Sequence, residues 1–191
     1  MNFLLLLFVS MITGNIALTY FLGMCPFVSM SKKVEVATGM GFAVTLVMVI
    51  TATANYLINT YILKPLGIEF LQFLVFIVTI ATIVQILEIY IDRYAPLLYA
   101  SFGLFLPLIT VNCSILGVSL LMNLRSYTLM ETVVFSLGSG LGWLLAIVTM
   151  GALRRRLAFS SPLKGLGDTG ITAILAGIMA MAFMGFSGVG R

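Results

Sequence analysis

Residues 36–63 read VATGMGFAVTLVMVITATANYLINTYIL and contain no aspartate, glutamate, lysine or arginine. A helix needs roughly 20 apolar residues to cross a hydrocarbon core about 30 Å thick, so this stretch is long enough to span a membrane. Five more runs without those four residue types flank it. The six runs are residues 1–31, 36–63, 70–87, 94–124, 132–153 and 169–190. The sequence therefore predicts an all-α integral membrane protein with six transmembrane helices.

The composition supports this fold class. Of the 191 residues, 61% are hydrophobic and only 8% are charged, whereas a soluble domain carries about 25% charged residues. The excess apolar surface must face a lipid bilayer, and the connections are too short to fold alone, so residues 1–191 are interpreted as a single transmembrane domain. The chain contains no histidine, so neither catalysis by histidine nor metal ligation by histidine is possible within it. The net charge of +4 does not indicate nucleic acid, because the cations lie in short clusters between apolar runs.

These cations predict the orientation. Positive charge gathers in cytoplasmic connections. Seven cations lie in the odd-numbered connections and three in the even-numbered connections and the C-terminus. The odd set is Lys32, Lys33, Arg93, Arg154, Arg155, Arg156 and Lys164, and the even set is Lys64, Arg125 and Arg191. Both termini are therefore expected on the outer, periplasmic side.

Spans one and four are longer than a membrane requires. A straight helix of 31 residues would reach about 47 Å at 1.5 Å per residue. Span one contains Gly23-Met24-Cys25-Pro26, and span four contains Pro107 followed by Thr110-Val111-Asn112-Cys113. Proline disfavours a helical conformation in the residue before it, so we expect both spans to be broken or re-entrant. The alternative is that proline and glycine are simply commoner in membrane helices.

The two overlong spans also suggest an internal repeat. Each holds one of the two cysteines of the chain, and Thr38-Gly39-Met40-Gly41 in span two loosely resembles Leu137-Gly138-Ser139-Gly140-Leu141-Gly142 in span five. The pattern predicts a 3+3 inverted repeat with halves of about 1–92 and 93–191. Broken helices in matching positions of an inverted repeat are typical of secondary transporters, which keeps a transporter open as an alternative function.

Cys25 and Cys113 allow three interpretations. They are small buried hydrophobic residues, partners in a disulfide, or ligands of a metal centre. Thiolates suit iron–sulfur clusters and zinc, but a closed site needs four ligands, so a partner subunit would have to donate the rest. Along straight helices Cys25 would lie near the cytoplasmic end of span one and Cys113 past the centre towards the outside. The two thiols can meet only if both spans break.

Other polar residues within the spans are weaker candidates. Glu88 and Asp92 lie close to Arg93 and would either line a cation path or pair with that arginine at the interface. Asn112, next to Cys113, needs a hydrogen-bond partner at membrane depth. The chain lacks a phosphate loop and a dinucleotide-binding fingerprint, so it is not expected to bind NADH itself.

Several of these stretches resemble one family of membrane subunits of bacterial redox-driven ion pumps. The resemblance covers essentially the whole chain and is carried by Leu22-Gly23-Met24-Cys25, by Ser31-Lys32-Lys33-Val34, and by residues 103–113 and 181–188. The family has two branches, the E subunit of Na+-translocating NADH:quinone oxidoreductase and the A subunit of the Rnf ferredoxin:NAD+ oxidoreductase. Residues 87–93, 110–113 and 138–143 resemble the quinone-reductase branch, and Cys25-Pro26-Phe27 is more similar to the Rnf branch.

The resemblance implies a multi-pass subunit of the bacterial inner membrane, paired with a homologous six-helix subunit of opposite orientation. It further implies that Cys25 and Cys113 join two partner cysteines around a [2Fe–2S] cluster. That cluster would carry electrons between flavin-bearing subunits, coupled to sodium movement, in a complex that also contains NADH- or ferredoxin-oxidising subunits. The chain would be a translocase subunit without a complete active site. A structural subunit with inert cysteines remains an alternative.

Overall fold

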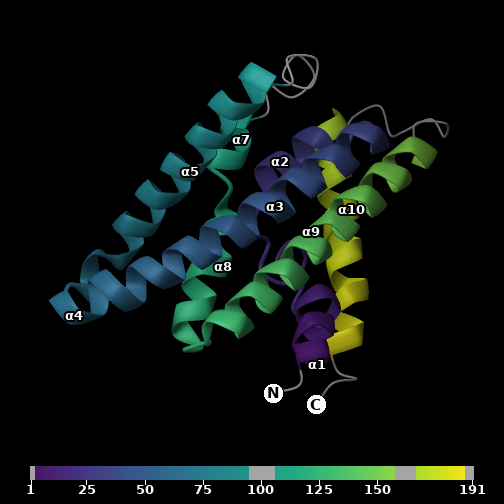
Figure 1. The fold of residues 1–191 in the computed structure, drawn as a ribbon. Helices are drawn as coiled ribbons and strands as arrows, with labels where there is room; N and C mark the ends of the chain where they lie inside the picture. Colours follow the sequence, from purple (N-terminus) through teal and green to yellow (C-terminus); the bar gives the residue numbers. More distant parts are fainter. Residues whose placement is uncertain (1–2, 95–105, 158–166, 188–191) are drawn as a thin grey trace.

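The structure is a computed structural model that describes residues 3–94, 106–157 and 167–187. Every regular element in these residues is helical, and they contain no strand. Figure 1 shows the helices running between two ends of one bundle, with α3 and α9 side by side at its centre. The elements are α1 (Phe3–Phe8), η1 (Val9–Thr13), α2 (Met24–Met30), α3 (Val34–Ile58), η2 (Asn59–Leu63), α4 (Lys64–Leu66), η3 (Glu69–Leu71), α5 (Gln72–Tyr94), α7 (Leu106–Thr110), α8 (Cys113–Leu124), α9 (Leu129–Leu157) and α10 (Gly167–Ser187).

Three helical segments in the described residues are long and apolar enough to cross a membrane. They cover Val34–Leu66, Gln72–Tyr90 and Leu129–Leu157. Shorter apolar helical segments cover Phe3–Thr13, Leu108–Leu124 and Thr169–Gly185. The outer side of α5 is strongly apolar, with Leu74, Val78 and Ile86 exposed by 59%, 56% and 63%. A surface of this kind suits lipid rather than water, which confirms the prediction of an all-α membrane protein.

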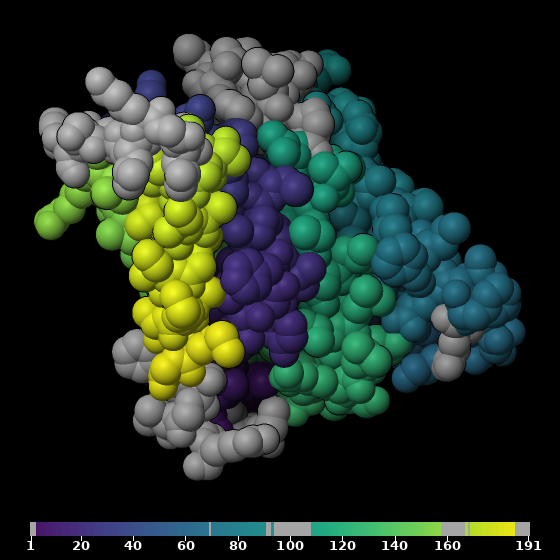
Figure 2. Space-filling view, turned by 180° about the vertical axis from the view of Figure 1, so that it is seen from behind, coloured from purple at the N-terminus to yellow at the C-terminus, as the bar shows by residue number. Residues whose placement is uncertain are grey.

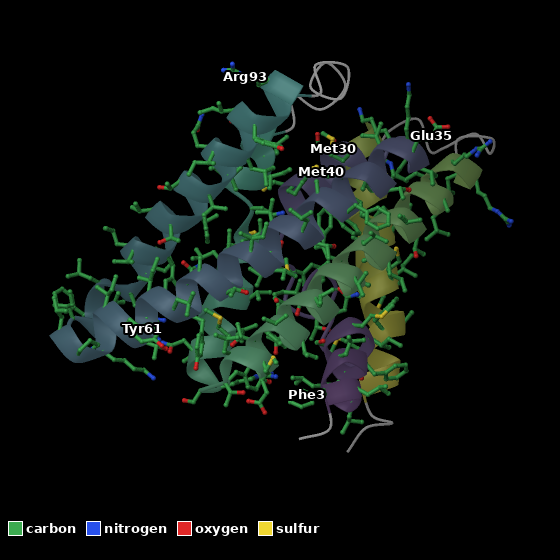
Figure 3. The ribbon with its side chains drawn as sticks, in the orientation of Figure 1. Phe3, Met30, Glu35, Met40, Tyr61 and Arg93 are labelled. Carbon is green, nitrogen blue, oxygen red and sulfur yellow. The ribbon has the colours of Figure 1, made fainter. Side chains whose placement is uncertain are left out.

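The two ends of the bundle match the expected alternation of the connections. Glu35 and Arg93 lie at one end, whereas Phe3 and Tyr61 lie at the other (Figure 3). The first end also holds the C-terminus of α9, because Arg154 donates hydrogen bonds to the Val28 carbonyl at 2.9 Å and to Ser31 Oγ at 2.8 Å. The cations of connections one, three and five that the structure describes therefore gather at one end. Lys164 and Arg191 lie outside the described residues.

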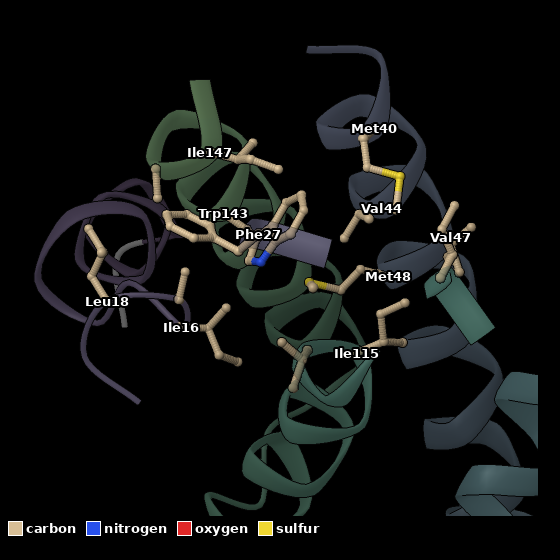
Figure 4. Close-up of a cluster of buried hydrophobic side chains, with 14 of the residues drawn as sticks. Ile16, Leu18, Phe27, Met40, Val44, Val47, Met48, Ile115, Trp143 and Ile147 are labelled. Carbon is tan, nitrogen blue, oxygen red and sulfur yellow. The ribbon is translucent and has the colours of Figure 1, made fainter. Parts of the chain in front are cut away.

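The core is centred on the crossing of α3 and α9, which approach closely because small residues face the contact. A Cβ on Gly41 of α3 would lie 2.8 Å from Leu144 Cγ, and a Cβ on Gly140 of α9 would lie 2.9 Å from Thr45 Cα. Large apolar side chains fill the space beside the crossing (Figure 4). Trp143, Phe27, Met48, Ile115 and Ile147 are all 0% exposed.

A row of buried and half-buried amides joins α3, α8 and α5 near the other end of the bundle. Asn55 Nδ2 of α3 donates to Ser119 Oγ of α8 at 2.9 Å, and Asn59 Nδ2 donates to Asn123 Oδ1 at 2.7 Å. Asn123 Nδ2 in turn donates to Gln72 Oε1 at the start of α5, at 2.7 Å. Hydrogen bonds between side chains of neighbouring helices hold membrane bundles together. The Nδ2 group of the buried Asn55 therefore has a hydrogen-bond partner on a neighbouring helix.

Candidate thiol site at two helix breaks

The first break covers residues 14–23, between η1 and α2. Non-helical backbone at membrane depth persists only where its polar groups find partners in the protein. Asn15 supplies several of them, since its Nδ2 donates to the Gly142 carbonyl of α9 at 2.8 Å and its Oδ1 accepts from the Ala17 N–H at 3.1 Å. Ile16 and Leu18 are each only 1% exposed. The break is therefore anchored to α9 by one amide and by buried apolar side chains.

The second break covers residues 111 and 112, between α7 and α8. Asn112 has an extended backbone and caps α8, because its Oδ1 accepts from the Ser114 N–H at 3.1 Å and from Ser114 Oγ at 2.8 Å. An N-cap of this kind satisfies one of the free N–H groups at a helix start. The helix that it starts begins with Cys113 itself. Asn112 was expected to need a hydrogen-bond partner, and it has one two residues along the chain, in Ser114.

The two prolines lie next to the breaks but do not produce them. Pro26 is the third residue of α2 and Pro107 the second residue of α7, so each lies in a first helical turn, where its missing N–H costs nothing. Cys25 is accordingly helical, and the expectation that Pro26 would force it out of the helix is wrong. The chain leaves the helical path upstream instead, after Thr13.

The geometry brings the breaks together at Gly23. This glycine is the N-cap of α2 and has a left-handed backbone with φ 77°. Its N–H donates to the Cys113 sulfur with an N···Sγ distance of 2.9 Å. Because consecutive Cα atoms are 3.8 Å apart, the Cα atom of Cys25 lies within about 8 Å of the Gly23 Cα. Cys25 and Cys113 therefore belong to one locality, each in the first turn of the helix that follows its break.

Both thiols are free and exposed in the single chain. Free cysteine is among the most buried residue types when it acts only as a packing residue, so burial as small hydrophobic side chains does not describe this pair. The N-terminal segment that carries Cys25 lies between α10 on one side and α8, which carries Cys113, on the other (Figure 2). Two thiols from distant parts of the sequence are thus exposed in one locality.

Two buried donors near Gly23 have no hydrogen-bond acceptor among the described residues. They are Asn112 Nδ2 and Trp143 Nε1. A Cβ on Gly23 would lie 2.7 Å from Trp143 Nε1 and 2.9 Å from Asn112 Oδ1, so both side chains border the residue that bonds to the Cys113 sulfur. The Trp143 ring is fixed by an edge contact with Phe27, at 6.5 Å between ring centroids. Donors without acceptors favour negative charge nearby.

Sequence reasoning identified both cysteines and Asn112, but it missed the roles of Gly23 and Asn15. Each of these acts through a partner far along the chain, Gly23 through Cys113 and Asn15 through Gly142. Glu88 is half-buried on α5, and the side chain of Asp92 lies outside the described residues. The described residues contain no cluster of three or more histidine, cysteine or acidic side chains that could hold a metal ion.

The cap on α8 gives a local prediction. Asn112→Ala removes the acceptor for Ser114 and should destabilise the first turn of α8 by about 1 kcal/mol. Asn112→Asp keeps an acceptor at the same position and should retain most of the cap. Hydrogen–deuterium exchange of the purified complex would show faster exchange at residues 113–116 in the alanine variant alone. Equal exchange in both variants would show that the cap does not hold this turn.

The fold and the site define a class, an all-α membrane protein that exposes two thiols at paired helix breaks. Residues 3–190 match the family described as "Rnf-Nqr subunit, membrane protein", and the chain belongs to this family. It is 48% identical to the E subunit of the Na(+)-translocating NADH-quinone reductase of Aeromonas salmonicida, with 98% of each chain covered. The protein of the same name from Nitrosomonas europaea is 47% identical, with 99% of each chain covered.

Proposed function

We propose that this chain is a membrane subunit of a sodium-translocating NADH–quinone reductase and that Cys25 and Cys113 each ligate a shared [2Fe–2S] cluster. The observation that carries the proposal is the Gly23–Cys113 contact, which brings two exposed thiols from the two breaks into one locality. The names of the full-length relatives support the complex and the quinone-reductase branch. When bound, the cluster supplies one-electron transfer.

The residues present suit half of such a site. Thiolates are the usual ligands of a [2Fe–2S] cluster, which takes four, and this chain offers two. Both are exposed, so a second subunit can reach them. Gly23 donates its N–H to the Cys113 sulfur and stabilises negative charge there. Trp143 and Asn112 exclude water from the inner side of the site and hold two donors beside it. The cysteine ligands are thus held from within and open towards a partner.

The proposed topology is six passes in a 3+3 inverted repeat, with both termini on the periplasmic side of the inner membrane. The α3–α9 contact supports the repeat because spans two and five, which the repeat would relate, each contribute a glycine to it. Gly41 of α3 faces Leu144 of α9, and Gly140 of α9 faces Thr45 of α3. Leu144 lies four residues after Gly140, and Thr45 lies four residues after Gly41. Figure 1 shows α3 and α9 running in opposite directions. A two-fold axis in the membrane plane would produce this pattern.

The partner at the thiol face would be a homologous six-helix subunit of opposite orientation, donating the other two cysteines. Electrons would reach and leave the shared site through flavin-bearing subunits, with NADH oxidised on a separate subunit of the complex. The chain's own residues hold the ligands and set their surroundings. They do not bind NADH or quinone in this proposal, so every step that binds substrate takes place on another subunit.

The test is the iron content of the purified complex. Cys25→Ala and Cys113→Ala should each remove the iron of the shared site, because the three remaining thiolates cannot close a four-ligand cluster. Val111→Ala is the matched control, since Val111 is 74% exposed, lies two residues from Cys113 and leaves both thiols in place. NADH oxidation by an artificial electron acceptor should persist in all three variants. Unchanged iron content in both cysteine variants would contradict the assignment.

The alternatives predict different results. The A subunit of an Rnf complex would accompany a ferredoxin-oxidising subunit, which the neighbouring genes would reveal. A secondary transporter would move solute in liposomes containing this chain alone, without redox substrates. A structural subunit with inert cysteines would leave the double Cys→Ala complex with full quinone reductase turnover.

A further inference from the structure

A cavity opens at the end of the bundle where α2, α9 and α10 meet. Its volume is about 520 Å³, within the range of about 300–1,000 Å³ that is usual for ligand pockets. It starts beside Cys25 and follows the exposed side of α2 towards the basic end of the bundle. The lining residues used in the argument below are Met24, Val28, Ser29, Lys32, Arg154 and Thr169.

The lining changes from apolar to cationic along the groove. Met24 and Val28 are apolar, Ser29 and Thr169 carry hydroxyl groups, and Lys32 and Arg154 are cations. Among the described residues, none that lines the groove is acidic. The wall at one end therefore suits hydrocarbon, and the wall at the other end suits an anion.

Arg154 is fixed in position rather than free to leave the groove. Its Nη1 donates to the Val28 carbonyl at 2.9 Å and to Ser31 Oγ at 2.8 Å, which ties the guanidinium to the end of α2. A guanidinium held in place loses little conformational freedom when an anion binds, and its planar donors match a phosphate group. Lys32 adds a second cation on the same wall.

We propose that this groove binds an anionic phospholipid, with the phosphate between Lys32 and Arg154 and an acyl chain against Met24 and Val28. A lipid is favoured over a soluble anion because the groove has an apolar end and lies between helices whose outer surfaces are apolar. The charge of the groove selects an anionic headgroup over a zwitterionic one. The proposal does not depend on the cluster, since it rests on other residues and on lipid binding.

The test compares two pairs of cations that are neighbours in sequence. In each pair one residue lines the groove and the other does not. Lys32 and Arg154 line the groove, whereas Lys33 and Arg155 do not. Lys32→Gln should therefore weaken binding of dioleoylphosphatidylglycerol to the delipidated complex about fivefold, as expected for one cation near an anionic headgroup, and Lys33→Gln should change it little. Arg154→Gln and Arg155→Gln repeat the comparison on α9. Native mass spectrometry of the detergent-purified complex measures the bound lipid.

A variant that fills the groove keeps the proposal testable if Arg154→Gln weakens the fold. Ser29 is exposed on α2, so Ser29→Phe should be tolerated and should displace the lipid while every cation remains. Dioleoylphosphatidylcholine, with the same acyl chains, should bind more weakly than the anionic lipid. Equal loss in Lys32→Gln and Lys33→Gln, equal binding of both lipids, or complete competition by inorganic phosphate would each overturn the proposal. Iron content should stay unchanged in Lys32→Gln, which separates this result from a failure of the cluster assignment.

Discussion

Gly23→Ala is expected to remove the iron of the shared site and to lower the thermal stability of the complex. The left-handed backbone at φ 77° costs a residue with a Cβ about 1–2 kcal/mol. The new methyl group would also lie 2.7 Å from Trp143 Nε1, 2.9 Å from Asn112 Oδ1 and 3.0 Å from Ser114 Oγ. Overpacking of this kind adds about 1–3 kcal/mol. The Trp143 and Asn112 side chains are buried, so we expect Gly23 to move away from Cys113, which breaks the N–H···S hydrogen bond.

The control for Gly23→Ala separates backbone strain from crowding. Gly67 has a similar left-handed backbone, with φ 67°, but a Cβ there would meet nothing within 4 Å. Gly67→Ala should therefore lower the free energy of unfolding only by the cost of a left-handed backbone, and it should leave the iron content unchanged. Thermal unfolding and iron per complex are measured for both variants. If the two variants behaved alike, the packing around Gly23 would have no part in holding the thiol site.

The sequence was most informative where a local property determines the structure. Long runs without charges predicted the helices that cross the membrane, and the residues matching Val34–Leu66 and Leu129–Leu157 do form long apolar helices. The excess length of runs one and four predicted that neither forms a single helix across its run. The positions of the cations predicted which connections share an end. Each of these inferences depends on the composition of a stretch of about 20 residues. Tertiary contacts have little influence on whether such a stretch crosses the membrane.

The exact positions of the breaks depended on contacts that sequence does not show. Pro26 was the strongest local signal, yet the chain leaves the helix at residue 14, where Asn15 bonds to the backbone of residue 142. The pairing of Gly23 with Cys113 spans 90 residues. No periodicity could reveal that the thiols are exposed, because the apolar runs look alike on the sides that face lipid, core and partner. The fold class was therefore predictable, and the geometry of the site was not.

The dependence of the site on α9 explains why a change distant from the thiols should still affect them. Gly142 accepts the hydrogen bond that anchors the first break, and a Cβ on it would lie 2.7 Å from the Met11 carbonyl oxygen. Trp143 packs against Phe27 of α2. Helix α9 also packs against α3. One helix thus positions both the crossing at the centre of the bundle and the segment that carries Gly23.

Gly140→Val should consequently disrupt both the α3–α9 crossing and the thiol site. The added Cβ would lie 2.7 Å from Thr45 Cγ2 and 2.9 Å from Thr45 Cα. Because the second contact is with backbone, a side-chain rotation cannot relieve it, and the two helices must separate. We expect a large fall in the amount of assembled complex in membranes. The complex that still assembles should contain correspondingly less iron. Gly177→Val on α10 is the control, since a Cβ there would meet nothing within 4 Å.

Second-site variants distinguish backbone contact from side-chain contact at the crossing. Gly41→Ala meets mainly the Leu144 side chain, at 2.8 Å from Cγ, so Leu144→Ala should restore much of the assembly lost in that variant. Thr45→Ala should restore little of the assembly lost in Gly140→Val, because the Thr45 Cα atom remains in place. Assembly is measured as complex recovered per milligram of membrane protein. Full rescue of Gly140→Val by Thr45→Ala would mean that the helices are not held at backbone distance, and the reciprocal packing that supports the inverted repeat would lose its basis.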